Sequence, residues 1–197
     1  MTRQTTFLLR LLGTTLVTTT LAFVAAQPSL AKEYADEETA ALLKVLNNSK
    51  ISLADGVRQV SKSGEVAISA KFELDDNKKL SLSVYTAEKG LGEDAEHNVL
   101  KEFSGSPEQA TWSPEAEVFK DIPHISRASQ HLALIALARN SLADLITTAQ
   151  KQNKGVVFSA NPAVSNHRPV LVLLVTDKNE VKELHYDLET GRDITAK

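Results

Sequence analysis

Five histidines are the side chains of this chain that could move a proton near neutral pH and that could bind a metal ion together with carboxylates. They are His97, His124, His131, His167 and His185. A zinc site needs histidine, cysteine or carboxylate ligands at short, regular spacing, as in His-x-x-x-His. The chain has no such pair and no cysteine, and His124 and His131 share a helix face only if their helix begins early. We therefore predict no metal ion and no cofactor.

Nucleophilic catalysis has no motif to support it either. The chain contains no Gly-x-Ser-x-Gly elbow, and Ser106 lies in a Gly-Ser-Pro loop without a base at a recognisable spacing. No glycine-rich phosphate loop follows an expected strand. Asp75-Asp76-Asn77 lacks the further oxygen ligands and the glycine of a calcium loop, so we interpret it as a turn. We conclude that the protein is not an enzyme.

The tetrapeptide Ser-Leu-Ala-Asp occurs twice, at Ser52–Asp55 and at Ser141–Asp144, each time between a helical apolar stretch and a β-type pattern. Each serine stands where a helix begins, and its oxygen can accept a hydrogen bond from the amide three residues on. The aspartate at that third position favours the amide-rich helix start. We therefore interpret Ser52 and Ser141 as helix caps and the two copies as an internal duplication.

The first copy predicts two helices followed by a β-hairpin. Apolar residues from Thr39 to Leu46 fall on one helical stripe, and the capped helix extends from Ser52 to about Lys62. Strict alternation then predicts strands at 66–74 and 80–84. A third strand is expected at 99–103 and a short helix at 114–120, because Ser-Pro-Glu is a good helix start. Trp112 and Phe119 are the expected anchors of this last segment.

The second copy repeats this order. We expect helices at 127–139 and 142–152, and strands at 156–160, 170–175 and 181–188, with a break at Pro162. Val170–Val175 does not alternate, which is typical of a strand covered on both faces. The candidate covers within the chain are the first repeat's sheet and the Trp112–Phe119 segment. If the outer face is open instead, the candidate interaction face comprises Leu171, Leu173, Val175 and Trp112.

The N-terminal stretch resembles an export signal. Arg3 and Arg10 precede an apolar stretch, and Ser29-Leu30-Ala31 places small residues at a cleavage site after Ala31, with Val24-Ala25-Ala26 as the competing site. Cleavage after Ala31 removes two arginines and no acid, which changes the net charge from −3 to −5. Such a charge disfavours nucleic acid and anionic membranes as partners. Without cysteine there is no lipobox, so we expect a periplasmic or secreted protein without a stable membrane anchor.

The C-terminal strand leads into Asp187-Leu188-Glu189-Thr190-Gly191-Arg192-Asp193-Ile194. A strand running into Asp-x-x-Thr-Gly-x-x-Ile after a capped helix and a hairpin resembles the PepSY domain family. The resemblance covers Ser141–Ile194 well and Ser52–Val84 moderately. It weakens at Val99–Pro107, where Lys101 stands in place of the aspartate. It implies that Asp187, Thr190 and Gly191 form the turn after the last strand, with Gly191 at a positive φ.

Together these observations predict an α+β protein of two tandem helix-loop-helix plus antiparallel β-sheet repeats. The expected parts are a signal peptide (1–31), a first repeat with a diverged loop and a short helix (32–123), and a second repeat (124–197). The residues of the structural signature are Ser52, Asp55, Ser141, Asp144, Asp187, Thr190 and Gly191. The PepSY resemblance implies a regulatory, protein-binding role in the cell envelope, with a peptidase as the partner class. The alternative is a ligand-binding or sensor accessory protein that uses an apolar sheet face.

Overall fold

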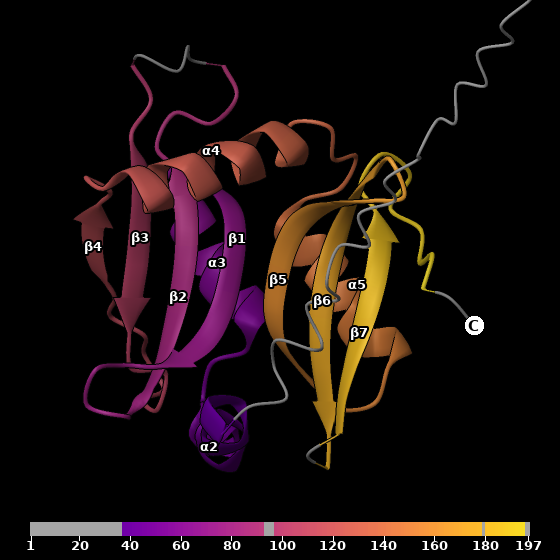
Figure 1. The fold of residues 1–197 in the computed structure, drawn as a ribbon. Coiled ribbons are helices and arrows are strands. Elements are labelled where there is room, and N and C mark those ends of the chain that lie inside the picture. Colours follow the sequence, from indigo (N-terminus) through magenta and orange to yellow (C-terminus); the bar gives the residue numbers. More distant parts are fainter. Residues whose placement is uncertain (1–36, 93–96, 179, 196–197) are drawn as a thin grey trace, which may run out of the picture.

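The computed structural model describes residues 37–92, 97–178 and 180–195, and shows an α+β fold built on a seven-stranded antiparallel sheet (Figure 1). The strand order is β4-β3-β2-β1-β5-β6-β7. The strands are β1 (Val66–Leu74), β2 (Leu80–Ala87), β3 (Leu100–Gly105), β4 (Glu115–Val118), β5 (Val156–Ser165), β6 (Arg168–Asp177) and β7 (Glu180–Asp187). The helices are α2 (Glu37–Val45), η1 (Leu46–Asn48), α3 (Leu53–Ser61), α4 (Ile122–Ile135) and α5 (Leu142–Gln152).

The helices cover the sheet unequally. In Figure 1, α3 and α5 lie together behind the sheet, and α4 crosses its front over β1, β2 and β3. The alternation of side chains along β1 explains why helices pack on both faces. Ala70 and Phe72 face the α3 side with their partners Val84 and Leu82. The side chain of Ser69 lies on the opposite face and contacts α4. The hairpin predicted at 66–84 is confirmed.

The two halves of the sheet meet at a short seam between β1 and β5. Ala70 pairs with Ala160, and Lys71 pairs with Ser159. Each seam strand carries a register shift at the same place, before Ser69 in β1 and before Ser159 in β5. Both serines are buried. The shared bulge supports the duplication that we infer from the repeated tetrapeptide.

Strand β6 is buried on both faces, as its uninterrupted apolar sequence predicted. All six residues of Val170–Val175 are at most 4% exposed. Leu171 lies on the α5 side, because its pairing partner Tyr186 donates a hydrogen bond to Gln152 of that helix. Neither predicted cover is correct. The first half of the sheet lies edge to edge with the second, and the Trp112 segment packs within the first half.

One expected element is of the wrong type, and several expected boundaries are wrong, among them the end of α4 at Ile135 where residue 139 was expected. The segment expected as a helix at 114–120 contains strand β4, because Glu115–Val118 completes a ladder on the open edge of β3. Helix α4 begins at Ile122, five residues earlier than expected, where Asp121 provides the cap. Strand β5 continues through Pro162, since β5 pairs with β1 only at Ser159 and Ala160 and a proline is tolerated where one side of a strand carries no ladder.

Candidate functional site

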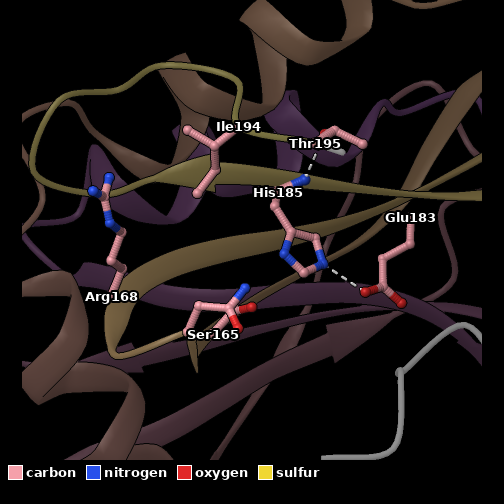
Figure 2. Close-up of a pocket in the computed structure, with 7 residues that line it drawn as sticks. Ser165, Arg168, Glu183, His185, Ile194 and Thr195 are labelled. Carbon is pink, nitrogen blue, oxygen red and sulfur yellow. Dashed lines mark hydrogen bonds and ion pairs between the residues drawn. The ribbon is translucent and has the colours of Figure 1, made fainter. Parts of the chain in front are cut away.

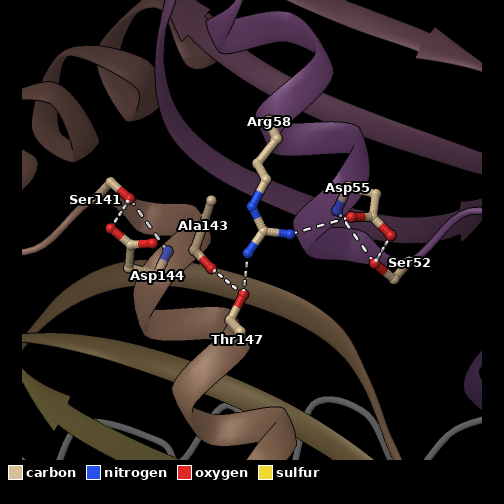
Figure 3. Close-up of polar contacts among 7 residues, drawn as sticks. All are labelled: Ser52, Asp55, Arg58, Ser141, Ala143, Asp144 and Thr147. Carbon is tan, nitrogen blue, oxygen red and sulfur yellow. Dashed lines mark hydrogen bonds and ion pairs between the residues drawn. The ribbon is translucent and has the colours of Figure 1, made fainter.

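The repeated Ser-Leu-Ala-Asp motif caps the two helices α3 and α5. The Oγ of Ser52 accepts from the amide of Asp55 at 3.2 Å and donates to its carboxylate at 2.6 Å. Ser141 and Asp144 repeat this arrangement with distances of 3.2 and 2.7 Å (Figure 3). Both hydroxyls are committed to helix starts, so the predicted capping role is confirmed.

The two capped helices are joined by a polar contact at their shared face. Arg58 of α3 donates to the hydroxyl of Thr147 of α5 at 2.5 Å, and that hydroxyl donates to the carbonyl of Ala143 (Figure 3). The other end of the Arg58 guanidinium pairs with Asp55 at 3.1 Å. Arg58 and Thr147 occupy the same position, six residues after their capping serines. The contact therefore links the two halves at matched positions.

The Asp-x-x-Thr-Gly segment forms the expected tight turn. A carboxylate oxygen of Asp187 accepts from both the amide and the hydroxyl of Thr190, at 2.8 and 2.9 Å. These bonds lower the pKa of Asp187, which also lies near Arg168. Gly191 has a φ of +70°, as predicted. The turn returns the chain along β7, where Asp193 bridges to Tyr186.

The first copy replaces that turn with a longer loop. The sequence alignment of Lys101 with Asp187 is wrong: Lys101 lies at the start of β3 and pairs with Thr86, whereas Asp187 ends β7 and pairs with Val170. Lys101 forms ion pairs with Glu65 at 3.0 Å and Glu88 at 2.8 Å. The loop from Ser106 to Pro114 carries Trp112, whose indole N–H donates to the carbonyl of Gly105. The return segment after this loop is β4, whereas the described return segment of the second copy pairs with β7 through the bridge at Asp193.

The candidate interaction face that we predicted is not available to a partner. Leu171, Leu173 and Val175 are at most 1% exposed and belong to the hydrophobic core. Trp112 is also 1% exposed, and its carbonyl accepts from Gln59 of α3. All four residues therefore stabilise the fold. The cleavage site at Ala31 lies outside the described residues.

An exposed corner lies at the other end of the sheet, where β4 leads into α4. Strand β4 is the outermost strand on the left of Figure 1, and its four residues are exposed. Val118 is 44% exposed, and Ile122 and Ile125 at the start of α4 are 81% and 39% exposed. Isolated exposed aliphatic residues are common, but these three lie within eight residues beside a free strand edge.

A small hollow of about 270 Å³ opens on the front of this corner, lined by Glu102, Glu117, Val118, Phe119, Lys120, Asp121 and His124. The ring of Phe119 stacks on Tyr85 at 5.6 Å and on His124 at 5.4 Å. Glu102 and Glu117 are paired directly opposite each other in β3 and β4, so their side chains share the front face. Neither forms a salt bridge within the part of the chain that the structure describes. The hollow is thus lined by the aromatic stack and by three acidic residues, with Lys120 as the cation among them.

A larger cavity of about 520 Å³ lies at the opposite end of the sheet (Figure 2). His185 and Glu183 project into it from β7, with the imidazole Nε2 at 2.5 Å from the carboxylate. The segment after β7 (residues 188–195, here called the tail) borders one side of the cavity, since the amide of His185 donates to the Thr195 hydroxyl. Sequence reasoning missed this site because its residues come from a hairpin turn, a strand and the tail. The remaining lining residues are Ser165, Asn166, Arg168 and Ile194.

The histidines are not brought together. His124 pairs with Asp121 at the start of α4, whereas His131 contacts Ser69 on β1 at 3.0 Å. Burial lowers the pKa of His131 to about 4, with Arg127 adding to the shift. Among the described residues, no three histidine or carboxylate side chains form a group that could hold a metal ion. No helix in residues 37–92, 97–178 and 180–195 is long and apolar enough to cross a membrane.

No protein-family model matches the chain, and no curated protein matches it. Among solved structures, the chain is similar to a candidate lipoprotein from Clostridium difficile 630, with a TM-score of 0.37 and 11% sequence identity. The alignment covers 75% of this chain and 92% of that chain. At this level of similarity, the function has to be argued from the residues of the chain itself.

Proposed function

We propose that this protein is exported and acts without catalysis, as a module that binds another protein of the cell envelope. The observation that carries the proposal is the corner of β4 and α4, where a free strand edge lies beside Val118, Ile122 and Ile125. Free edges and grouped exposed aliphatic residues are features by which proteins recognise one another. The PepSY resemblance adds the partner class, a peptidase whose activity the module restrains.

The buried sheet face supports protein binding over the ligand-binding alternative. That alternative needs an open apolar groove on β6, but Val170–Val175 is buried on both faces. The signature residues at the two helix starts and in the Thr-Gly turn are likewise occupied within the fold. The exposed corner remains, where Val118 of β4 and Ile122 and Ile125 of α4 are accessible beside the outer edge of β4.

Site-specific crosslinking tests this proposal. A photoreactive residue is placed at Val118 and, in a matched variant, at Leu137, an aliphatic residue 51% exposed just beyond α4. We expect one envelope protein to crosslink from position 118 and not from 137, and the purified partner, if a peptidase, to lose activity when the module is added. Equal crosslinking from both positions would contradict the assignment of this corner as the binding surface.

The second candidate is a ligand site in the cavity around His185 (Figure 2). The observation in its favour is the mixture of Arg168, Glu183 and His185 around one volume, which suits a small polar molecule. His185→Ala would then abolish binding of that molecule without lowering the crosslinking at position 118. Unchanged thermal stability of the wild type across a panel of charged and zwitterionic metabolites would remove this candidate.

A further inference from the structure

We propose that the free edge of β4 accepts an extended segment of the partner as an eighth strand, and that this segment alternates basic and apolar side chains. The inference rests on the proposed function and names how the partner is held. Strand addition of this kind takes affinity from main-chain hydrogen bonds and specificity from alternate side chains.

The hydrogen-bond register shows which backbone groups are available. The amide of Phe119 donates to the carbonyl of Leu100 at 3.0 Å, so Phe119 turns its polar groups toward β3. Backbone direction alternates along an antiparallel strand. Ala116 and Val118 therefore turn their N–H and C=O groups away from β3, toward the open side. No described strand pairs with that side.

The opposite edge of the sheet is treated differently. Along β7 the returning tail donates from the amide of Ile194 to the carbonyl of His185, and Asp193 bridges to Tyr186. The outer edge of β7 is thus partly occupied by the chain itself. Among the described residues, the fold therefore closes the edge of β7 with its own return segment and leaves the edge of β4 unpaired.

The side chains of β4 indicate what the added strand must carry. Glu115 and Glu117 lie on the front face, where Glu117 is directly opposite Glu102. Like charges at opposite positions destabilise a sheet, and a cation beside them relieves the repulsion. On the back face, Val118 presents an exposed aliphatic surface. An added strand therefore pairs best with lysine or arginine toward the front and an apolar side chain toward the back.

The same charges argue against a second copy of this chain as the occupant. Two β4 strands pairing with each other would bring Glu115 and Glu117 against the same carboxylates of the other copy. Charged residues on an edge strand are a known protection against such self-association. The acidic edge therefore disfavours pairing with β4 of a second copy and favours pairing with a basic strand.

The test uses the mature protein and two synthetic peptides with acetylated and amidated ends. Valine alternates with lysine in one (the lysine peptide) and with glutamate in the other (the glutamate peptide). Affinity is measured by fluorescence anisotropy, and amide hydrogen exchange is followed at Ala116 and Val118. We expect the lysine peptide to bind more tightly than the glutamate peptide and to slow exchange of the two outward amides. Equal binding of the two peptides would overturn the charge argument.

Two variants separate strand addition from surface attraction. Ala116→Pro removes an outward N–H and leaves the hydrogen bonds to β3 in place. The affinity for the lysine peptide should therefore fall by about three- to tenfold or more. Its matched control, Ala116→Val, keeps the N–H and should bind at least as tightly as the wild type. Unchanged affinity of Ala116→Pro would refute strand addition, even if crosslinking at position 118 still finds a partner and so upholds the proposed function.

Charge reversal provides an independent measurement if Ala116→Pro fails to fold. Glu117→Lys should shift the preference from the lysine peptide to the glutamate peptide. An unshifted preference would contradict the proposal. Sedimentation at neutral pH completes the test, because a wild-type dimer that Ala116→Pro abolishes would identify a second copy as the occupant and overturn the proposal.

Discussion

At the scale of single residues, the two capping serines offer a matched pair of measurements. Ser52→Ala and Ser141→Ala should each lower the free energy of unfolding by about 0.5–2 kcal/mol, because each leaves a helix-start amide without its acceptor. Ser→Asn at either position should retain most of the stability, since asparagine also caps helices. Binding measured well below the melting transition should not change. Loss of binding at unchanged stability would give these serines a functional role instead.

Gly191 combines a backbone constraint with a steric one. Its φ is +70°, and a Cβ there would lie 2.1 Å from the side-chain nitrogen of Asn140. Gly191→Val should therefore cost about 1–3 kcal/mol of unfolding free energy through backbone strain alone. Gly191→Asn should be milder, because asparagine tolerates positive φ, and should improve further when Asn140→Ala removes the crowding. If Val and Asn at position 191 behave alike in denaturant titrations, backbone strain at this turn is not the cause.

At the scale of elements, α4 contacts the sheet through His131, a histidine with a lowered pKa. His131 contacts Ser69 on β1, and its pKa is lowered to about 4 by burial. The unfolded chain takes up this proton near pH 6.5, so between those pH values the unfolded state holds more protons. Stability should therefore fall as the pH falls from about 6.5 to 4, by at most about 3 kcal/mol.

The His131 contribution can be isolated by substitution. His131→Gln should flatten the dependence of the unfolding free energy on pH within that window. His167→Asn is the control, because His167 lies exposed in a hairpin turn at a positive φ that asparagine tolerates. A slope that survives in His131→Gln would assign the acid sensitivity to another group.

What the sequence predicted at this scale was set by local signals. Caps, hairpin alternation and the doubly buried β6 depend on near neighbours along the chain, and the structure contains all of them. Strand β4 was expected as a helix because Ser113-Pro114-Glu115 is a local helix start, whereas its pairing with β3 is a contact that the local pattern does not encode. The exposed corner was missed for the same reason, because it is formed by the outer edge of β4. The His185 cavity was missed because a turn, a strand and the tail meet only in the folded chain.

At the scale of the whole molecule, the two halves share one hydrophobic core. Residues of both halves, from Leu42 to Leu188, belong to a single buried cluster, and α3 packs on α5 across the seam. The seam ladder is short, with small side chains at Ala70 and Ala160. We therefore expect the halves to unfold together, because neither buries enough apolar surface when it is alone.

The single tryptophan makes this expectation measurable, because Trp112 reports on the first half while mutations are placed in the second. Leu171→Asp and Val172→Asp put a carboxylate on opposite faces of β6, where both residues are at most 4% exposed, so each buries an unpaired charge. Each should lower the denaturation midpoint, and Trp112 fluorescence should shift by the same amount as the far-ultraviolet circular dichroism. Val164→Asp is the matched control, since Val164 lies on β5 but is 51% exposed and should leave the midpoint nearly unchanged. If the Trp112 transition stays at its wild-type midpoint while the circular dichroism splits into two steps, the halves fold independently and the shared core does not couple them.

If only one of the two β6 variants is destabilised, the face that carries the other substitution is open. The variant with unchanged stability is then the first to examine for lost partner binding.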